Sequence, residues 1–412
     1  MPKFRYRARD KEGVEQGGIH DAADRYELAR VLRTQNLLLL EAEDVETSAG
    51  KSFFKFNFSF SSVTFLQRVS LSEKIIFSKN LGVMIGAGLH LTRALEALSR
   101  ESHNQKLKNV INDVTDQVRQ GKTFAESLGR HPKVFPSLYI AMVEAGEKSG
   151  KLKESLAVLA SQMQADYDLV RKVRGAMMYP SVIFVAMILI GALMMIYVVP
   201  TLTSVFEELD TELPAATRFV IALSNAFVNH GLLMALGAFL VIAGLVYFRR
   251  TPLGKRTMDT IMIKMPLVSP LAKKFNAART ARTLSSLLSA GVQVMDALDI
   301  TGRVVQNHFY SAVLTDAKKS IQKGETISKI FLEHEDLYPS LVGEMLSVGE
   351  ETGESSRMLG EVATFYEQQV ADTTRDLSTI IEPILMIIIG VVVGFFAIAM
   401  LTPMYSLTES IN

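Results

Sequence analysis

Two stretches of this 412-residue chain come close to GxxxxGK[ST], the loop whose amides and lysine bind nucleotide phosphates. The stretch 45–52 ends in Gly-Lys-Ser, but Val45 stands where the first glycine is required, and no helical pattern follows. The stretch 145–152 lacks both the first glycine and the final hydroxyl. A second copy of that stretch has Glu354 in place of Lys151, and a carboxylate repels phosphate. We therefore predict no nucleotide site and no cofactor.

A more informative element, Gly-Glu-x-x-Gly, occurs twice between helical patterns. Its defining residues are Gly146, Glu147 and Gly150 in the first copy, and Gly349, Glu350 and Gly353 in the second. The glycines permit a helix end and a turn at positive φ, and the hydroxyl of Ser149 or Thr352 is suited to cap the helix that follows. This predicts a turn motif. Two roles are open to the glutamates: contact with basic groups of a cytoplasmic partner, or with a helix end of their own module.

Composition and spacing argue against other kinds of chemical site. The chain has no cysteine, which excludes disulfides, thiolate catalysis and cysteine-ligated metals. Its seven histidines show no paired ligand spacing, so no metal site is predicted, and no Ser/His/Asp arrangement can be argued. The 44 basic and 43 acidic residues nearly cancel, so no net field favours nucleic acid. We expect a protein that is not an enzyme.

Both Gly-Glu-x-x-Gly elements lie inside a longer duplication. A unit of about 130 residues recurs 203 positions further along without a gap. Ala87-Gly88 recurs as Ala290-Gly291, Gly121 as Gly324, Pro180 as Pro383 and Pro200 as Pro403. Because chance matches do not concentrate at turn residues, the two copies should have the same structure.

Each copy ends in an apolar segment, and a third apolar segment lies between the copies. The segments 182–199, 232–248 and 384–401 contain no charged residue, and each is close to the roughly 20 residues needed to cross a bilayer. Buried core helices are the alternative, but uncharged runs of this length are uncommon in soluble folds. We predict spans at 180–200, 232–248 and 383–403. The residues that bound the first and third spans are Pro180, Pro200, Glu382, Pro383 and Pro403.

Charged residues beside the spans predict their orientation. The basic residues next to the first two spans are Arg171, Lys172, Arg174, Arg249, Arg250, Lys255 and Arg256. The intervening segment 201–231 has a single basic residue and four acidic ones. Because basic residues stay in the cytoplasm, we expect this segment to be a periplasmic loop. The N-terminus is then cytoplasmic and the C-terminal tail 404–412 periplasmic, and the middle span returns the chain so that both copies lie on one side.

The rest of the chain is predicted to be mainly α-helical. Residues 71–178 and 274–381 carry apolar residues at helical spacing, interrupted by glycine and proline breaks. This predicts two homologous cytoplasmic bundles of about six helices each, with the last helix running into a span. A cytoplasmic connector at 249–273 joins the second span to the second bundle.

Residues 1–46 have a different pattern, which predicts a small α+β cytoplasmic domain. The predicted elements are a strand at 4–8, a turn at 10–13, a helix at 22–35 with Asp21 or Asp24 as its cap, and a strand at 37–45. Residues 47–70 are predicted to be a linker. Their Ser/Phe-rich part, 47–66, is suited equally to a free linker and to a segment on the membrane surface.

Gly390 and Gly394 form a GxxxG pattern within the third span. This pattern lets two helices approach closely, which makes the two glycines candidates for a helix–helix contact. The pattern is also common by chance in apolar helices, so two alternatives are open: self-association through the two glycines, or a chance occurrence without a contact.

These features together resemble the PilC/GspF family of inner-membrane platform proteins from type IV pilus and type II secretion machines. The resemblance covers nearly the full length. It rests on the Tyr-x-Ala-x-Asp-x-x-Gly start at 6–13, the turns at 87–88 and 290–291, both Gly-Glu-x-x-Gly elements, and the pairs Tyr179-Pro180, Val199-Pro200 and Glu382-Pro383. It implies two helical cytoplasmic domains and three spans in the bacterial inner membrane.

The resemblance also implies a non-enzymatic platform that couples a hexameric motor ATPase, for extension and for retraction, to insertion and extraction of pilin subunits. Pilins or pseudopilins, other inner-membrane assembly components and further copies of the chain would be its partners. The C-terminal sequence 403–407 favours the pilus branch, and the equivalent secretion-system platform is the alternative. A membrane transporter is disfavoured by the uncharged spans and the parallel repeat. A signalling enzyme is disfavoured because no nucleotide signal is convincing.

Overall fold

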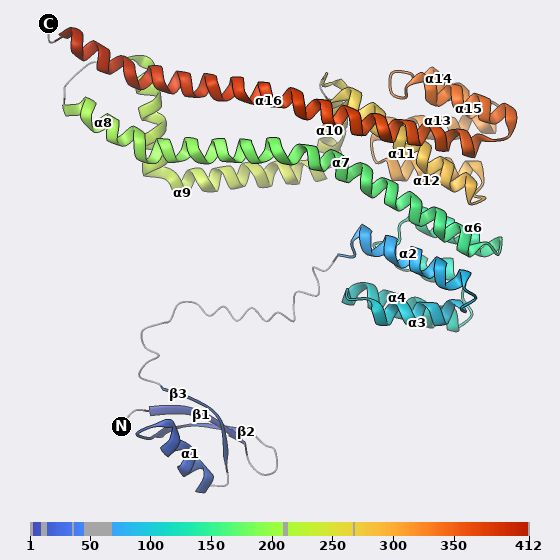
Figure 1. Ribbon diagram of the computed structural model, residues 1–412, viewed down its shortest axis with the longest axis horizontal. Coiled ribbons are helices and arrows are strands. Elements are labelled where there is room, and N and C mark those ends of the chain that lie inside the picture. The colour runs from blue at the N-terminus through green and yellow to red at the C-terminus, as the bar shows by residue number, and fades with distance from the viewer. Residues whose placement is uncertain are drawn as a thin grey trace. The chain divides into compact units, whose positions relative to one another are not determined.

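The computed structural model describes residues 3–9, 15–34, 37–44, 68–208, 213–266 and 268–410. They belong to two compact units, Met1–Leu66 and Gln67–Asn412 (Figure 1). The described part of the first unit is α+β, and that of the second unit is helical. The predicted class, mainly α with a small N-terminal α+β domain, is therefore confirmed.

The first unit is a three-stranded antiparallel sheet with one helix. Its elements are β1 (Lys3–Arg9), β2 (Glu15–Asp21), α1 (Arg25–Thr34) and β3 (Leu38–Asp44), with strand order β2-β1-β3. Phe4 and Ala8 of β1 are buried in one cluster with Leu28 and Leu32 of α1. Because alternate residues of a strand share a face, the apolar residues of β1 are placed against the helix.

The sequence pattern does not predict β2, because Gly17 and Gly18 are poor strand formers. In the structure Gly18 pairs with Tyr6 of β1. A Cβ on Gly18 would lie 2.9 Å from the Tyr6 hydroxyl oxygen, so the glycine makes room for the ring. The turn predicted at 10–13 and the segment 47–66 lie outside the described residues.

Helix α1 begins at Arg25 because Asp24 caps it. The Asp24 carboxylate accepts hydrogen bonds from the amides of Tyr26 and Glu27 at 2.8 and 2.7 Å. Of the two caps considered from the sequence, Asp24 has this role and Asp21 ends β2.

The second unit contains two modules of six helices each. The first module consists of α2 (Leu71–Gly86), α3 (Leu91–Glu101), α4 (Gln105–Arg119), α5 (Phe124–Gly129), α6 (Ser137–Lys148) and α7 (Leu152–Leu193). The second consists of α11 (Ser269–Ser289), α12 (Val294–Val305), α13 (His308–Gln322), α14 (Ile327–Glu333), α15 (Ser340–Thr352) and α16 (Ser355–Ser410). The helices α7 and α16 continue far beyond their modules (Figure 1).

Equivalent glycines of the two modules adopt the same backbone conformation. Gly88 and Gly291, which follow α2 and α11, have φ of 88° and 83°. Gly121 and Gly324 have φ of 88° and 84°. Residues with a side chain rarely adopt such angles. The shift of 203 positions therefore aligns the two folds residue by residue.

The cores of the two modules differ at pairs of residues in contact, and at each such pair both residues differ together. In the first module the rings of Phe77 and Phe135 have centroids 5.9 Å apart. At the equivalent positions of the second module, the hydroxyls of Thr280 and Tyr338 form a hydrogen bond of 3.0 Å. An apolar pair in one copy is thus a polar pair in the other.

A second exchange runs in the opposite direction. The hydroxyls of Ser78 and Tyr139 in the first module are buried and 2.8 Å apart. Their equivalents in the second module, Ala281 and Val342, are both buried and apolar. Because a buried hydroxyl without a partner is costly, the two positions of each pair are expected to change together.

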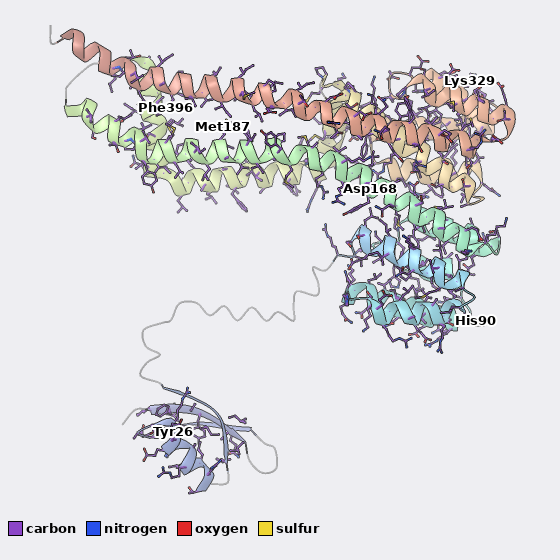
Figure 2. All side chains as sticks on the ribbon, viewed as in Figure 1. Tyr26, His90, Asp168, Met187, Lys329 and Phe396 are labelled. Atoms are coloured by element: carbon purple, nitrogen blue, oxygen red, sulfur yellow. The ribbon has the colours of Figure 1, made fainter. Side chains whose placement is uncertain are left out.

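Among the residues that the structure describes, three helices are long and apolar enough to cross a membrane. The first is α7, which continues through a π-helical turn, η3 (Met194–Val198), into α8 (Val199–Glu208); the others are α9 (Ala215–Arg250) and α16. Side chains project from all sides of these helices beyond the modules, where Met187 and Phe396 lie (Figure 2). Many of their large apolar side chains are exposed, as a surface in contact with lipid requires.

The segment 201–231, predicted to be a loop, is largely helical. Helix α8 extends to Glu208, and α9 begins at Ala215 and kinks at His230 (φ −127°, ψ 24°) instead of beginning at 232. The connector 249–273 likewise contains α10 (Pro252–Lys264) and the start of α11. The apolar pattern does not predict where these helices end, because polar residues also have good helix propensity and the helix can extend beyond the apolar run.

Candidate functional site

Both glutamates of the Gly-Glu-x-x-Gly elements bind the start of a short helix in their own module. The two carboxylate oxygens of Glu147 accept from the amides of Phe124 and Ala125, at 2.7 and 3.0 Å. Glu350 accepts in the same way from the first two amides of α14, at 2.7 and 3.2 Å. These amides lack partners within their helix, and a negative charge is favourable there. Each glutamate therefore holds α5 or α14 against the helix that carries it.

The two glycines of each element have different roles. A Cβ on Gly146 would lie 2.5 Å from the Cβ of Ser155 on α7, and a Cβ on Gly349 would lie 2.7 Å from the backbone of α16. The second glycines, Gly150 and Gly353, have φ of 68° and 73°. The first glycine thus permits close contact with the following helix, and the second forms the turn.

The hydroxyls inside the two elements belong to the preceding helices. Ser149 donates to the carbonyl of Ala145 at 2.7 Å, and Thr352 donates to that of Val348 at 2.8 Å. The prediction that they cap the following helices is therefore wrong, because the carbonyl four residues back is within closer reach. The amides of the turn within 145–152 donate to carbonyls of α6, so they are already used. The other stretch resembling a phosphate loop, 45–52, lies outside the described residues.

A polar contact joins α7 of the first module to α11 of the second. Gln162, which is 3% exposed, donates to the Thr283 hydroxyl at 3.2 Å and accepts from the Ser286 hydroxyl at 2.8 Å. Asp166 pairs with Arg279, with Nε–Oδ1 and Nη2–Oδ2 distances of 2.9 and 3.2 Å. The surrounding apolar core is continuous across both modules. Buried polar contacts of this kind fix one register, so the modules form one body.

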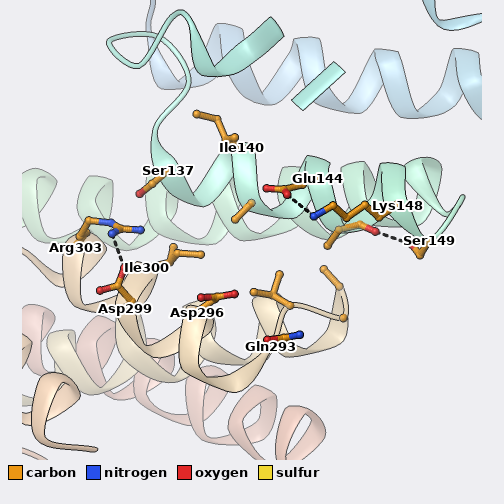
Figure 3. A pocket seen from close by; sticks show the side chains of 15 residues that line it. Ser137, Ile140, Glu144, Lys148, Ser149, Gln293, Asp296, Asp299, Ile300 and Arg303 are labelled. Carbon is orange, nitrogen blue, oxygen red and sulfur yellow. Dashed lines mark hydrogen bonds and ion pairs between the residues drawn. The ribbon is translucent and has the colours of Figure 1, made fainter. Parts of the chain in front are cut away.

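An open groove of about 690 Å³ separates α6 from α12 beside this contact (Figure 3). Lys148 and Glu144, 2.6 Å apart, line its α6 side, and Arg303 and Asp299, 2.5 Å apart, line its α12 side. The hydrogen bond that the Lys148 ammonium donates to the Glu144 carboxylate raises the pKa of Lys148, and the charge of Asp296 on α12 raises it further. Charged groups of the two modules therefore attract each other across the groove.

The residues predicted to bound the inner ends of the spans lie within continuous helices. Pro180 is inside α7 and buried, whereas Glu382 and Pro383 are inside α16 and exposed. No helix begins or ends at these residues. That these residues lie at the membrane boundary stays a prediction, because no change in secondary structure marks the boundary.

At the far end of α16, a hydroxyl from α9 replaces a missing backbone donor. Pro403 has no N–H to donate to the carbonyl four residues earlier, which is that of Ala399. Thr217 of α9 donates to this carbonyl at 2.5 Å, and both residues are buried.

The equivalent proline of the first copy has a similar arrangement. Pro200 follows the π-helical turn, in which the amide of Val199 bonds to Met194. This leaves the carbonyl of Met195 without a helical donor. Ser224 of α9 donates to it at 2.6 Å. One face of α9 therefore serves both duplicated prolines.

Comparison with known proteins places this architecture. A profile described as type II secretion system protein F matches residues 77–200 and again 280–403, and its N-terminal domain profile matches 1–43. The chain belongs to the type II secretion system protein F family. These proteins are also called platform proteins, and the two matched ranges differ by the same 203 positions as the duplication.

Relatives of this family come from two kinds of machine. The type IV pilus assembly protein PilC of Thermus thermophilus is 34% identical over 413 residues, covering all of both chains. The PilC protein of Myxococcus xanthus is 33% identical and covers 82% of this chain and 81% of its own. The type II secretion system protein F of Pseudomonas aeruginosa is 28% identical over the full length of both. Family membership and the three apolar helices indicate a multi-pass inner-membrane protein.

In this platform protein, Gly390 and Gly394 have open surroundings. A Cβ added to either would meet no atom within 4 Å among the described residues, so no described helix of the same chain packs closely on them. Contact of the pair with another molecule stays a prediction. The described residues also contain no group of three or more histidine, aspartate and glutamate side chains placed to hold a metal ion.

The polar contacts that join the modules and the spans of this platform protein carry little signal in the sequence. Gln162 is recognisable only by comparison of the copies, since the equivalent residue is Phe365. Thr217 and Ser224 have one available signal, because they lie seven positions apart on a helix that neighbours two duplicated prolines. Their acceptors are backbone carbonyls, which no residue type marks.

Proposed function

We propose that this chain is the inner-membrane platform of a type IV pilus assembly machine. It would couple a hexameric cytoplasmic motor ATPase to insertion and extraction of pilin subunits, without an enzymatic activity of its own. The identities of 34% and 33% to PilC proteins, against 28% to a secretion protein F, support the pilus assignment. The platform of a type II secretion system is the second candidate, because full-length relatives carry that name.

The continuity of α7 and α16 is the observation that carries this proposal. Each helix begins inside a module at a Gly-Glu-x-x-Gly turn and runs without interruption into an apolar span. A packed helix transmits a displacement of one end to the other, and the identifiable positions at which these two helices can bend are Pro180 in α7 and Pro383 in α16. Motion of the joined modules would therefore tilt or rotate the outer parts of the spans.

The flanking charges support a single arrangement across the membrane. Basic residues at 171–174 and 249–256 would keep both modules in the cytoplasm, where a motor ATPase works, and the ends near 201–231 and 404–412 in the periplasm. Exposed apolar side chains along the three spans would offer a surface to the apolar helix of a pilin or pseudopilin. Other inner-membrane assembly components and further copies would contact the same body.

The modules would present different surfaces to the motor. The exposed residues Lys148 and Lys151 of the first module correspond to the exposed Glu351 and Glu354 of the second. Since charge complementarity selects partners, the two ends would meet different sites on the motor. The carboxylates of Glu147 and Glu350 are occupied by helix amides, and would shape these surfaces by positioning α5 and α14.

Site-directed crosslinking tests this function, because the chain has no cysteine of its own. Single cysteines at 151 and 354 report on the two modules, and one at 240, exposed on α9, is the control. We expect both module sites, but not the control, to capture a motor ATPase in cells. If neither module captures one, the coupling function is contradicted. Co-purified major pilin and retraction motor indicate a pilus, whereas pseudopilins and a secretin-linked protein indicate secretion.

A further inference from the structure

The contact between the two modules is head-to-tail, and so it leaves one face of each module uncovered. The α7 face of the first module covers α11 of the second. The equivalent faces, on α16 and on α2, have no such cover among the described residues. Phe365 on α16 is 47% exposed, and Ile76 and Val83 on α2 are 54% and 65% exposed. Large apolar side chains in this position, outside the spans, mark an interaction surface.

The residues at the centre of the contact within the chain differ from their equivalents on the uncovered faces, and this difference indicates what covers those faces. Within the chain, polar Gln162 packs on polar Ser286. Their equivalents under the 203-residue shift are Phe365 and Val83, which are both apolar. At the Gln162–Ser286 pair both sides have therefore changed from polar to apolar, although Phe365 and Val83 lie on different modules. Thr283, the second partner of Gln162, corresponds to Asn80, which is still polar.

The neighbouring ion pair shows the same coupled change. Asp166 and Arg279 pair within the chain at 2.9 Å. Their equivalents are Gln369 and Ile76, so both charges are absent on the uncovered faces. If only one charge were lost, the other would be buried without a partner in a matching contact.

The groove provides a third coupled change, in which both charges are reversed. Lys148 on α6 faces Asp296 on α12 across the groove (Figure 3). Their equivalents are Glu351 on α15 and Arg93 on α3. Glu351 and Arg93 are both exposed, and neither has an ion-pair partner within the described part of the chain. A positive–negative contact thus becomes a negative–positive one.

We propose that the second module of one copy docks on the first module of another copy, in the geometry that joins the two modules within one chain. Phe365 of one copy then covers Ile76 and Val83 of the next, and Glu351 pairs with Arg93. Two surfaces that never met would have no physical reason to change in step at three places. Such a heterologous contact links copies head-to-tail, and it does not depend on which machine the platform serves.

Mixed single-cysteine variants of the full chain test this contact in membranes. One copy carries Ile76→Cys and one tag, and the other carries Phe365→Cys and a second tag, so that any product joins two molecules. We expect a dimer-sized product with both tags. Lys319→Cys, at an exposed position on α13 away from the proposed contact, should give no such product when it is combined with Ile76→Cys.

Reversing the charges of Arg93 and Glu351 provides a second test of the same contact. Arg93→Glu or Glu351→Arg in both copies should lower the crosslinked fraction about tenfold, because like charges then face each other. The double variant should restore it, and Lys319→Glu should leave it unchanged. The proposal is overturned if the product is absent, if the charge variants have no effect, or if Phe365→Cys crosslinks only to itself or to a different protein.

Discussion

The Thr217 hydroxyl of α9 donates to the Ala399 carbonyl of α16, the acceptor that Pro403 leaves without its helical partner. Ser224, two turns further along α9, does the same for Met195 beside Pro200. Helix α9, which contains the middle span, has no counterpart in the duplication, yet its part before the kink at His230 contacts the same proline position of both copies. It therefore joins the two copies at their far ends.

Replacement of Thr217 by valine should loosen this junction. Thr217→Val keeps the shape but leaves the Ala399 carbonyl buried without a donor, at a cost of about 1 kcal/mol in the free energy of unfolding. Thr217→Ser, which keeps the donor, is the matched control and should stay close to the unmodified chain. Denaturant titration in detergent micelles measures both, and equal stabilities of the two variants would contradict the role given to the hydroxyl.

The bonds of Glu147 and Glu350 predict that their amide variants are less stable. A glutamine at either position offers one acceptor oxygen in place of two and loses the charge that favours a helix start. We expect each substitution to cost about 1–2 kcal/mol and to raise hydrogen exchange at the first amides of α5 or α14.

Glu144→Gln provides the control for Glu147→Gln on the same helix. Glu144 is exposed and pairs with Lys148, and a solvent-screened surface pair contributes little to the free energy of unfolding. Loss of exchange protection in α5 should follow only the substitution of Glu147. If both variants protect α5 equally, Glu147 does not position that helix.

The close approach at Gly146 predicts opposite outcomes for two glycine-to-alanine changes. Gly146→Ala places a methyl group 2.5 Å from Ser155 Cβ and should cost about 1–3 kcal/mol. Gly175→Ala, within the same long helix pair but with open space around it, should stabilise the chain by up to about 1 kcal/mol. Thermal unfolding of the two variants in one detergent gives the comparison. A Gly146→Ala chain as stable as Gly175→Ala would mean that α6 and α7 separate without cost.

Much of the fold follows from local patterns in the sequence. The duplication, the spans and the six helices per module depend on glycine turns and helical periodicity, which act within a few residues. Strand β2 could not be predicted in this way, because Gly18 is required by the ring of Tyr6 on the neighbouring strand, which is a tertiary contact. The helix at 201–208 could not be predicted in this way either, because the apolar run that marks the span ends before the helix does.

The candidate site was predictable as a motif but not as a set of contacts. The spacing Gly-Glu-x-x-Gly identifies the turn, yet the partner of Glu147 is a backbone amide 23 positions earlier, which has no residue signature. Thr217 and Ala399 are separated by 182 positions, and again the acceptor is backbone. Contacts between two side chains are easier to find from the sequence, because both residues of the contact differ between the two copies. Phe77 and Phe135 of the first copy, for example, correspond to Thr280 and Tyr338 of the second.

Two buried tyrosines predict a loss of stability in alkali. Burial raises the pKa of Tyr139 and of Tyr338 above the usual value, and this effect outweighs that of their hydrogen bonds with Ser78 and Thr280. Because the raised pKa belongs to the folded state, the contribution is complete below the unfolded pKa of about 10 and is lost as pH rises towards the folded one. Each tyrosine should then steepen the decline by at most about 1.4 kcal/mol per pH unit.

Melting curves of the full chain between pH 8 and 11.5, on the scale where free tyrosine titrates, measure this decline. The double variant Tyr139→Phe, Tyr338→Phe should be less stable at pH 8, because it loses two buried hydrogen bonds, but its stability should fall less steeply above about pH 10. Tyr26→Phe is the control, since Tyr26 is 83% exposed and should leave the slope unchanged. Parallel slopes for all three chains would show that these hydroxyls ionise freely in the folded protein.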